Sequence, residues 1–258
     1  MRTLAGGITT WMHRRRLDAV RERLAGMFGY ELAGAELSPV APGAAGGDDP
    51  AEISSTAYVV VALPDRWRVV ERGHVEVCDG RHSWSGTGTL VTESRGDPVP
   101  VSEAGVVGIC LYPARLVGGL TFDEPAEAMV EGRRCWSVGA RPRPLVDTGS
   151  LAALGLSVGR HLTEFVGVEH QFWFDAATGI VLRHEGSIDG ELCSTIAMTD
   201  LVVDGPVSGN EFATPPGAVV RSPHELLRDH LADLGIDPDS VDLDDPDQVR
   251  TALRRGVE

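Results

Sequence analysis

A serine flanked by glycines is the first stretch of this chain that could do chemistry. Gly155, Ser157 and Gly159 match the pattern Gly-x-Ser-x-Gly, in which a sharp strand-to-helix turn exposes the nucleophile of α/β hydrolases. Asp175 and His184 follow in the chain order that such a triad needs. The residues before the serine favour a helix over a strand, and the flanking pattern indicates antiparallel strands. We therefore predict no catalytic residue, and we keep a serine hydrolase as an alternative.

Histidine and glutamate residues between positions 161 and 170 are possible metal ligands. A helix would place His161 and Glu164 on one face, and Glu169 and His170 follow. The chain has no His-Glu-x-x-His pattern, and no third ligand stands at a diagnostic spacing. The 4 cysteines share no Cys-x-x-Cys spacing, so we expect them to be reduced and buried. We predict neither a metal site nor a cofactor.

The composition excludes several functions. All 23 basic residues are arginines, so the chain cannot form a phosphate loop that needs a lysine, or a lysine Schiff base. The 258 residues carry a formal net charge of −15. A surface this acidic repels phosphate backbones, so we expect no nucleic-acid partner.

Aromatic residues point instead to a binding function. They fall on segments with strand composition, where alternate side chains share one face of a sheet. The residues concerned are Trp67, Trp84, Trp136, Phe172, Trp173 and Phe174. They form plain core if helices cover that face, and they line a ligand cavity if the face stays partly open. We take Trp84, Trp136, Phe172 and Phe174 as the candidate ligand-binding residues.

The sequence predicts that these residues lie on an antiparallel meander of strands. The dipeptides Asp79-Gly80 and Asp189-Gly190 predict type I′ hairpin turns, because both central residues of that turn need positive φ. Short helices are expected over 113–120 and 150–156. The expected strands lie at 56–64, 67–73, 86–94, 133–144, 172–174, 180–186 and 191–203, and residues 74–86 hold two more, one on each side of Asp79-Gly80.

Helices are expected at both ends of the chain. Over residues 9–29, apolar side chains recur at helix spacing among arginines, which predicts an amphipathic helix that packs on the domain or contacts an anionic membrane. Ser222 and Glu225 form a capping box for a helix that stops at Gly235, and 246–255 forms a last helix. We divide the chain into an N-terminal amphipathic extension (1–37), a Pro/Gly/Ala-rich linker (38–53), a strand-rich domain (54–220) and an acidic helical tail (221–258).

Location follows from two absences in the sequence as written. No apolar run approaches the ~20 residues that span a bilayer, and the start of the chain lacks the order of a secretory signal. We therefore expect a cytoplasmic protein, or an extracytoplasmic one if the start codon is misassigned.

The segment from Phe172 to Val220 resembles the C-terminal half of the LolA-type lipoprotein carriers. Their relatives include LolB, the sigma-factor regulators of the RseB/MucB kind and actinobacterial lipoprotein-sorting-like proteins. The shared features are a strand that ends in Asp175, two glycine-containing turns, a Thr-Asp-Leu strand and a closing Phe-Ala-Thr-Pro-Pro-Gly. Upstream, PDRWRVV and DGRHSWSG resemble the early strands of that family. The resemblance covers roughly residues 54 to 220.

The resemblance implies an α+β fold in which a curved antiparallel sheet forms an incomplete β-barrel with covering helices. It also implies a non-enzymatic binding protein that holds a lipid, an acyl chain or another apolar ligand in the half-barrel. The alternative that it implies is a regulatory module whose partner is a protein segment, as in the sigma-factor regulators.

Overall fold

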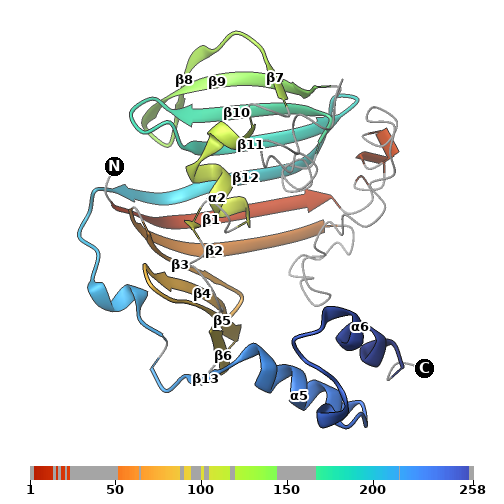
Figure 1. The fold of residues 1–258 in the computed structure, drawn as a ribbon. Helices are drawn as coiled ribbons and strands as arrows, with labels where there is room; N and C mark the ends of the chain where they lie inside the picture. The colour runs from red at the N-terminus through yellow and green to blue at the C-terminus, as the bar shows by residue number, and fades with distance from the viewer. Residues whose placement is uncertain are drawn as a thin grey trace.

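A long antiparallel sheet dominates the computed structural model (Figure 1). The structure describes residues 3–13, 16, 19–20, 22–23, 52–63, 65–87, 90–93, 100–101, 105–116, 120–143, 167–214 and 216–255. The strands are β1 (Thr3–His13), β2 (Glu52–Ala62), β3 (Arg66–Glu71), β4 (His74–Asp79), β5 (Ser83–Thr87), β6 (Leu90–Glu93), β7 (Leu120–Phe122), β8 (Ala126–Val130), β9 (Arg133–Pro142), β10 (Glu169–Asp175), β11 (Val181–Ile188), β12 (Glu191–Val203) and β13 (Val219–Arg221).

The sheet is open at both ends. Its order is β13-β6-β5-β4-β3-β2-β1-β12-β11-β10-β9-β7, and β8 also pairs with β9. Every pairing is antiparallel except that of β13 with β6, which is parallel. Within the described part of the chain, β13 does not pair with β7, so the barrel does not close. This confirms the expected fold class, a curved antiparallel sheet that forms an incomplete barrel with a covering helix.

Hairpin turns with positive φ set the strand order. Asp189 (φ 51°) and Gly190 (φ 77°) form the two-residue turn predicted between β11 and β12. Asp79-Gly80 differs from the prediction, because only Gly80 has a positive φ. The Asp79 carboxylate instead accepts hydrogen bonds from the backbone N–H groups of Arg81 and His82, which gives an Asx-type turn.

Residues 9–13, which the sequence analysis expected to be helical, belong to a strand. Thr3–His13 is strand β1 and lies between β12 and β2, at the middle of the sheet. Its alternate residues Leu4 and Ile8 are buried, which is the period of a strand. On Gly6, a Cβ atom would lie 2.9 Å from the carbonyl oxygen of Thr199, so the close approach of β12 needs glycine there. The sheet therefore includes residues that the sequence interpretation placed in an extension.

The described residues that follow β1 are helical, and two of their arginines face the β11–β12 hairpin. Residues 16, 19–20 and 22–23 are helical. The Arg16 guanidinium lies 3.0 Å from the Glu191 carboxylate, and that of Arg23 lies 3.2 Å from the Asp189 carboxylate. These contacts direct both positive charges at the domain itself.

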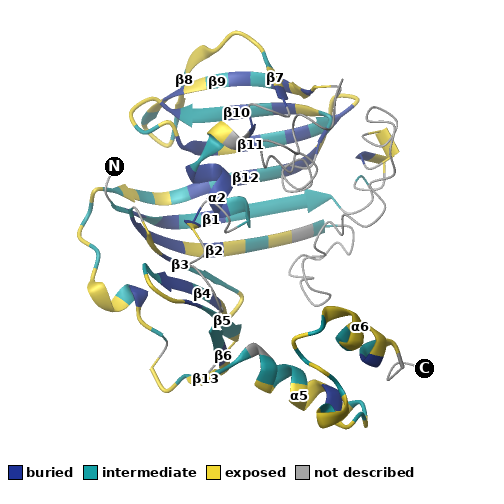
Figure 2. Ribbon diagram, in the orientation of Figure 1, coloured by how far each residue is buried: buried dark blue, intermediate teal, exposed yellow. Residues whose placement is uncertain are grey.

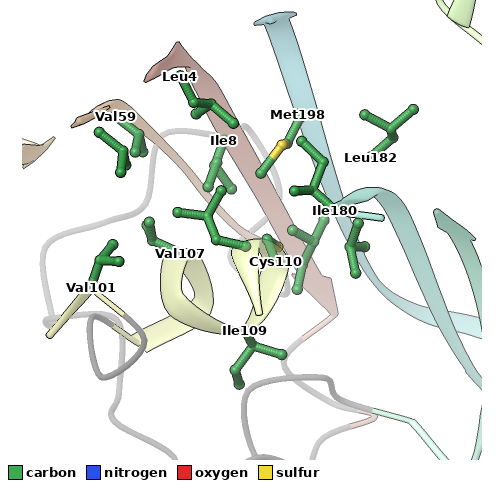
Figure 3. Close-up of a cluster of buried hydrophobic side chains, with 14 of the residues drawn as sticks. Leu4, Ile8, Val59, Val101, Val107, Ile109, Cys110, Ile180, Leu182 and Met198 are labelled. Atoms are coloured by element: carbon green, nitrogen blue, oxygen red, sulfur yellow. The ribbon is translucent and has the colours of Figure 1, made fainter. Parts of the chain in front are cut away.

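One short helix covers the inner face of the sheet. Helix α2 (Gly105–Leu111) has no charged residue and buries Val107, Ile109 and Leu111. It lies across β11, β12 and β1 (Figure 1), and its residues Val107 and Cys110 lie toward Leu4, Ile8 and Met198 (Figure 3). Burying each such aliphatic side chain stabilises the fold by about 1.5–3 kcal/mol. The 3-10 helix η2 (Pro113–Leu116) follows and forms part of the segment 113–120 expected to be helical.

Two helices follow β13 at the end of the chain. Helix α5 (Pro223–Asp233) starts with the predicted capping box between Ser222 and Glu225. Helix α6 (Pro246–Arg255) confirms the last predicted helix. Both are exposed over most of their surface (Figure 2). The 3-10 helices η3 (Gly209–Phe212) and η4 (Pro238–Ser240) lie in the connecting segments.

Two further expectations from the sequence concern the cysteines and the membrane. Cys78, Cys110, Cys135 and Cys193 are all buried, as predicted. None of the helices in the described part of the chain has the length and apolar character that crossing a bilayer takes.

Candidate functional site

Several of the residues that could do chemistry lie outside the described residues. These are the Gly-x-Ser-x-Gly segment around Ser157 and the pair His161 and Glu164. Asp175 and His184, the other members of the alternative triad, lie on β10 and β11, and the Asp175 carboxylate is held by Arg133. Within the described ranges, no group of three metal-ligating side chains comes together.

The structure brings together three of the four predicted ligand-binding residues. Phe172 and Phe174 lie on β10, and Trp136 on β9 stands directly opposite Phe174. Side chains two residues apart on a strand, or directly opposite on neighbouring strands, share one face of the sheet. These three residues therefore lie on the face that α2 covers, since Phe172 belongs to the same hydrophobic cluster as Leu4 and α2.

Trp84 lies apart from the other three. It stands on β5 opposite Val77 and packs with Val60 and Phe212 in a separate cluster. Ala5 belongs to that cluster, whereas its neighbour Leu4 belongs to the α2 cluster. Because adjacent residues of a strand point to opposite faces, Trp84 packs on the other side of the sheet.

A row of rings runs along β10 on the α2 face. The ring centroids of Phe172 and Phe174 lie 5.7 Å apart in a stacked pair, and those of His170 and Phe172 lie 5.9 Å apart. Phe122 of β7 approaches Phe172 at 6.2 Å. We call His170, Phe172, Phe174 and the facing Trp136 the aromatic row.

The aromatic row passes from the interior to the surface. Phe172 is 0% exposed and His170 4% exposed, whereas Phe174 is half-buried and Trp136 is 42% exposed. The outer end of the row is thus open to solvent while its inner end is enclosed.

Trp136 borders two hollows at the open end of the row. One hollow has a volume of about 240 Å³ and the other, more open, about 610 Å³. Both are lined by Arg134, Trp136 and Ala176. Met129, which is 60% exposed, lines the smaller hollow, so thioether and indole surfaces lie side by side there. Such surfaces bind apolar groups readily.

An ion pair lies in the wall of the larger hollow. Arg133 Nε donates a hydrogen bond of 2.6 Å to Asp175 Oδ2, which joins the β8–β9 hairpin to the loop after β10. Asp175 also accepts hydrogen bonds from Ala177 and Thr178. Burial alone would raise the pKa of Asp175, but the hydrogen bonds from Arg133, Thr178 and Ala177 outweigh it and lower the pKa.

A pair of buried histidines closes the inner end of the row. His170 Nδ1 lies 3.0 Å from His184 Nε2, and the two rings stand on neighbouring strands. Burial lowers the pKa of His170 to about 4. Burial lowers the pKa of His184 as well, and the neighbouring His170 adds to this effect. Both imidazoles are therefore neutral at pH 7. The sequence singled out His170 only as a metal candidate and gave no signal for this pairing.

The comparisons with known proteins match no family model and no curated protein. Solved structures do show similarity. An uncharacterised conserved protein from Thermus thermophilus is 10% identical, with a TM-score of 0.41, over 85% of this chain and 90% of that one. The complex of MucA and MucB from Pseudomonas aeruginosa is similar at 13% identity with a TM-score of 0.44. The match covers 85% of this chain and 58% of the matched chain. A LolA superfamily protein from Nitrosomonas europaea is 9% identical, with a TM-score of 0.29, over 82% and 90% of the two chains.

Proposed function

We propose that the protein is a non-enzymatic binding protein that holds a lipid, an acyl chain or another apolar ligand along the aromatic row. The observation that carries this proposal is the continuity of the row, which leads from the exposed Trp136 to the enclosed Phe172. A chain-like ligand that enters at Trp136 would remain in contact with aromatic faces as it moves inward. Burying such a ligand gains about 0.8 kcal/mol for each methylene group.

The apolar face beneath α2 supports the same proposal. In the described part of the chain, this face presents Leu4, Ile8, Ile196 and Met198 from the central strands. Helix α2 covers the face and contacts β11 and η2. Because α2 is short and apolar and makes no strand pairing, a ligand could displace it from the sheet without breaking the pairing of any strands. The ligand would then replace the aliphatic contacts of the helix with its own.

Titration with the apolar fluorophore 1-aminoanthracene tests the proposal. We expect saturable binding to the wild-type protein, and about tenfold weaker binding to Trp136→Ser, because one aromatic contact contributes about 0.5–1.5 kcal/mol beyond its burial. Val202→Ser is the matched control, since Val202 is 52% exposed and pairs with Ala5, on the side of the sheet away from α2. It should bind as the wild type does. Absence of saturable binding by the wild-type protein would remove the proposed function.

A second candidate function is the binding of a protein segment at the β13 edge. Val219 and Leu90, which stand directly opposite each other on β13 and β6, are 57% and 44% exposed. Among the described residues β13 pairs only with β6, so its other edge is free to pair with an extended chain. If this edge binds a partner, capture of that partner by the wild-type protein should be lost in Val219→Asp and kept in Val202→Asp.

A further inference from the structure

His170 occupies a special position at the inner end of the aromatic row. It is 4% exposed, and its Nδ1 atom is engaged with His184 at 3.0 Å. Its other ring nitrogen, Nε2, is buried and has no hydrogen-bond partner among the described residues. Buried polar atoms are nearly always hydrogen-bonded in folded proteins, so an unpaired one needs an explanation.

The strands next to β10 supply no polar group at this point. Ala140 of β9 and Gly186 of β11 stand directly opposite His170. Along β10 the next residue on the same face is Phe172, whose ring lies 5.9 Å away. The one other titratable side chain of these strands that meets His170 is His184, which is neutral at pH 7. Among the described residues, the row thus ends in an uncharged hydrogen-bonding atom beside Ala140, Gly186 and Phe172.

The charge state of this atom limits what it can bind. Burial holds the pKa of His170 at about 4, so the ring carries no charge at neutral pH. A phosphate or an ammonium head group would therefore meet no counter-charge there and would lose its hydration. The hydrogen between the two rings can sit on either of them, so Nε2 acts as a donor in one tautomer and as an acceptor in the other. A group that both donates and accepts suits either tautomer.

We propose that the ligand of the aromatic row carries an uncharged head with an O–H group, a carboxylic acid or an alcohol, and that this head hydrogen-bonds His170 Nε2. The inference rests on the proposed function, since it names the class of ligand that the same face takes. The tail of the ligand would lie on Phe172 and Phe174 and reach Trp136 at the open end. Residues 170 and 174 are about 13 Å apart along the strand, which gives the row room for a medium-length alkyl chain.

Displacement of 1-aminoanthracene by ligands of equal chain length tests this inference. The ligands are decan-1-ol, decanoic acid and decane, and the variants are His170→Phe and His74→Phe. His74 is the matched control, because its side chain is 48% exposed and lies on β4. For the wild-type protein and His74→Phe we expect decan-1-ol to bind about tenfold more tightly than decane, which corresponds to about 1.4 kcal/mol. Decanoic acid is mostly ionised at neutral pH, so its affinity should rise as the pH falls toward 5 and its uncharged form becomes populated. In His170→Phe, this preference should disappear, so that decan-1-ol and decane bind with affinities within about twofold of each other.

The outcomes separate the two proposals. If the dye binds but the wild-type protein does not prefer an oxygen-bearing head over decane, the head-group inference fails and the proposed function stands. The same holds if His170→Phe keeps the preference. If neither the dye nor any decyl ligand binds, the proposed function itself fails. A preference for decan-1-ol over decane supports the inference, and so does a preference for decanoic acid that grows as the pH falls. Tight binding of decanoic acid at neutral pH that does not depend on pH would contradict it. Should His170→Phe not fold, His170→Gln retains a donor and an acceptor and should keep part of the preference.

Discussion

Arg133 and Asp175 form an ion pair that ties the β8–β9 hairpin to the loop between β10 and β11. The Arg133 side chain is 32% exposed, whereas that of Asp175 is 2% exposed. A carboxylate this deeply buried depends on its partner, because removing the partner leaves an uncompensated charge in the interior. The pair also sets the spacing of the walls around Trp136.

Replacing Arg133 should therefore cost stability. We expect Arg133→Met to lower the free energy of unfolding by about 3 kcal/mol, the usual size of the loss when one partner of a buried pair is removed. Urea unfolding followed by far-ultraviolet circular dichroism measures this change. Arg134→Met is the matched control: its side chain is 74% exposed and lies 3.4 Å from an exposed Glu127, so the expected loss is below about 0.5 kcal/mol. Equal losses in the two variants would contradict the role given to the ion pair.

The buried histidines predict that the protein loses stability in mild acid. In the unfolded chain His170 takes up a proton near pH 6.5, whereas in the folded protein burial lowers its pKa to about 4. Between these values the unfolded state binds more protons, so stability falls as the pH falls. The stabilisation is complete above pH 6.5, and His170 alone should account for a loss of about 2 kcal/mol at pH 5. The lowered pKa of His184 acts in the same direction.

Unfolding in urea at pH 7.5 and pH 5 checks this prediction. His170→Phe should show a smaller difference between the two pH values than the wild-type protein, because it lacks one of the groups that take up a proton on unfolding. His74→Phe, which removes an exposed histidine, should keep the wild-type difference. If both variants respond to pH alike, the buried pair does not control acid stability.

Local signals in the sequence predicted most of the sheet. The strand expected over 191–203 is β12 with the same bounds, because Asp189-Gly190 fixes its start and Asp204-Gly205 its end. The capping box at Ser222 fixed the start of α5 in the same way. Helix α2 was not predicted, since its seven residues are too few to show a helical period. Strand β1 was missed because the arginines and helix-spaced apolar residues after His13 extended the helical pattern back over its second half.

The candidate site was only partly predictable, because it depends on strand pairing. The alternation of side chains along a strand shows that Phe172 and Phe174 share a face of the sheet. Whether Trp84 lies on that same face depends on the register of every strand pairing between β5 and β10. The pairing of His170 with His184 depends on the register across the loop after Asp175, where a bulge between Trp173 and Phe174 shifts the strands. No local sequence pattern determines either register. From the sequence we therefore grouped Trp84 with Trp136, Phe172 and Phe174, and we did not predict the contact between His170 and His184.

Because Trp84 lies apart from the aromatic row, we predict that Trp84 contributes to stability and Trp136 contributes to ligand binding. Trp84 is half-buried against Val77 and Phe212, so Trp84→Ala should lower the free energy of unfolding by about 2 kcal/mol, less than the roughly 3–5 kcal/mol typical of fully buried aromatic residues. It should leave the affinity for 1-aminoanthracene unchanged, because it lies on the other side of the sheet. Trp136→Ala should show the opposite behaviour, a loss of dye affinity with a change in stability below about 1 kcal/mol, since Trp136 is 42% exposed. Urea unfolding and dye titration of both variants measure the two effects together, and a common loss of dye affinity would mean that binding does not depend on the aromatic row.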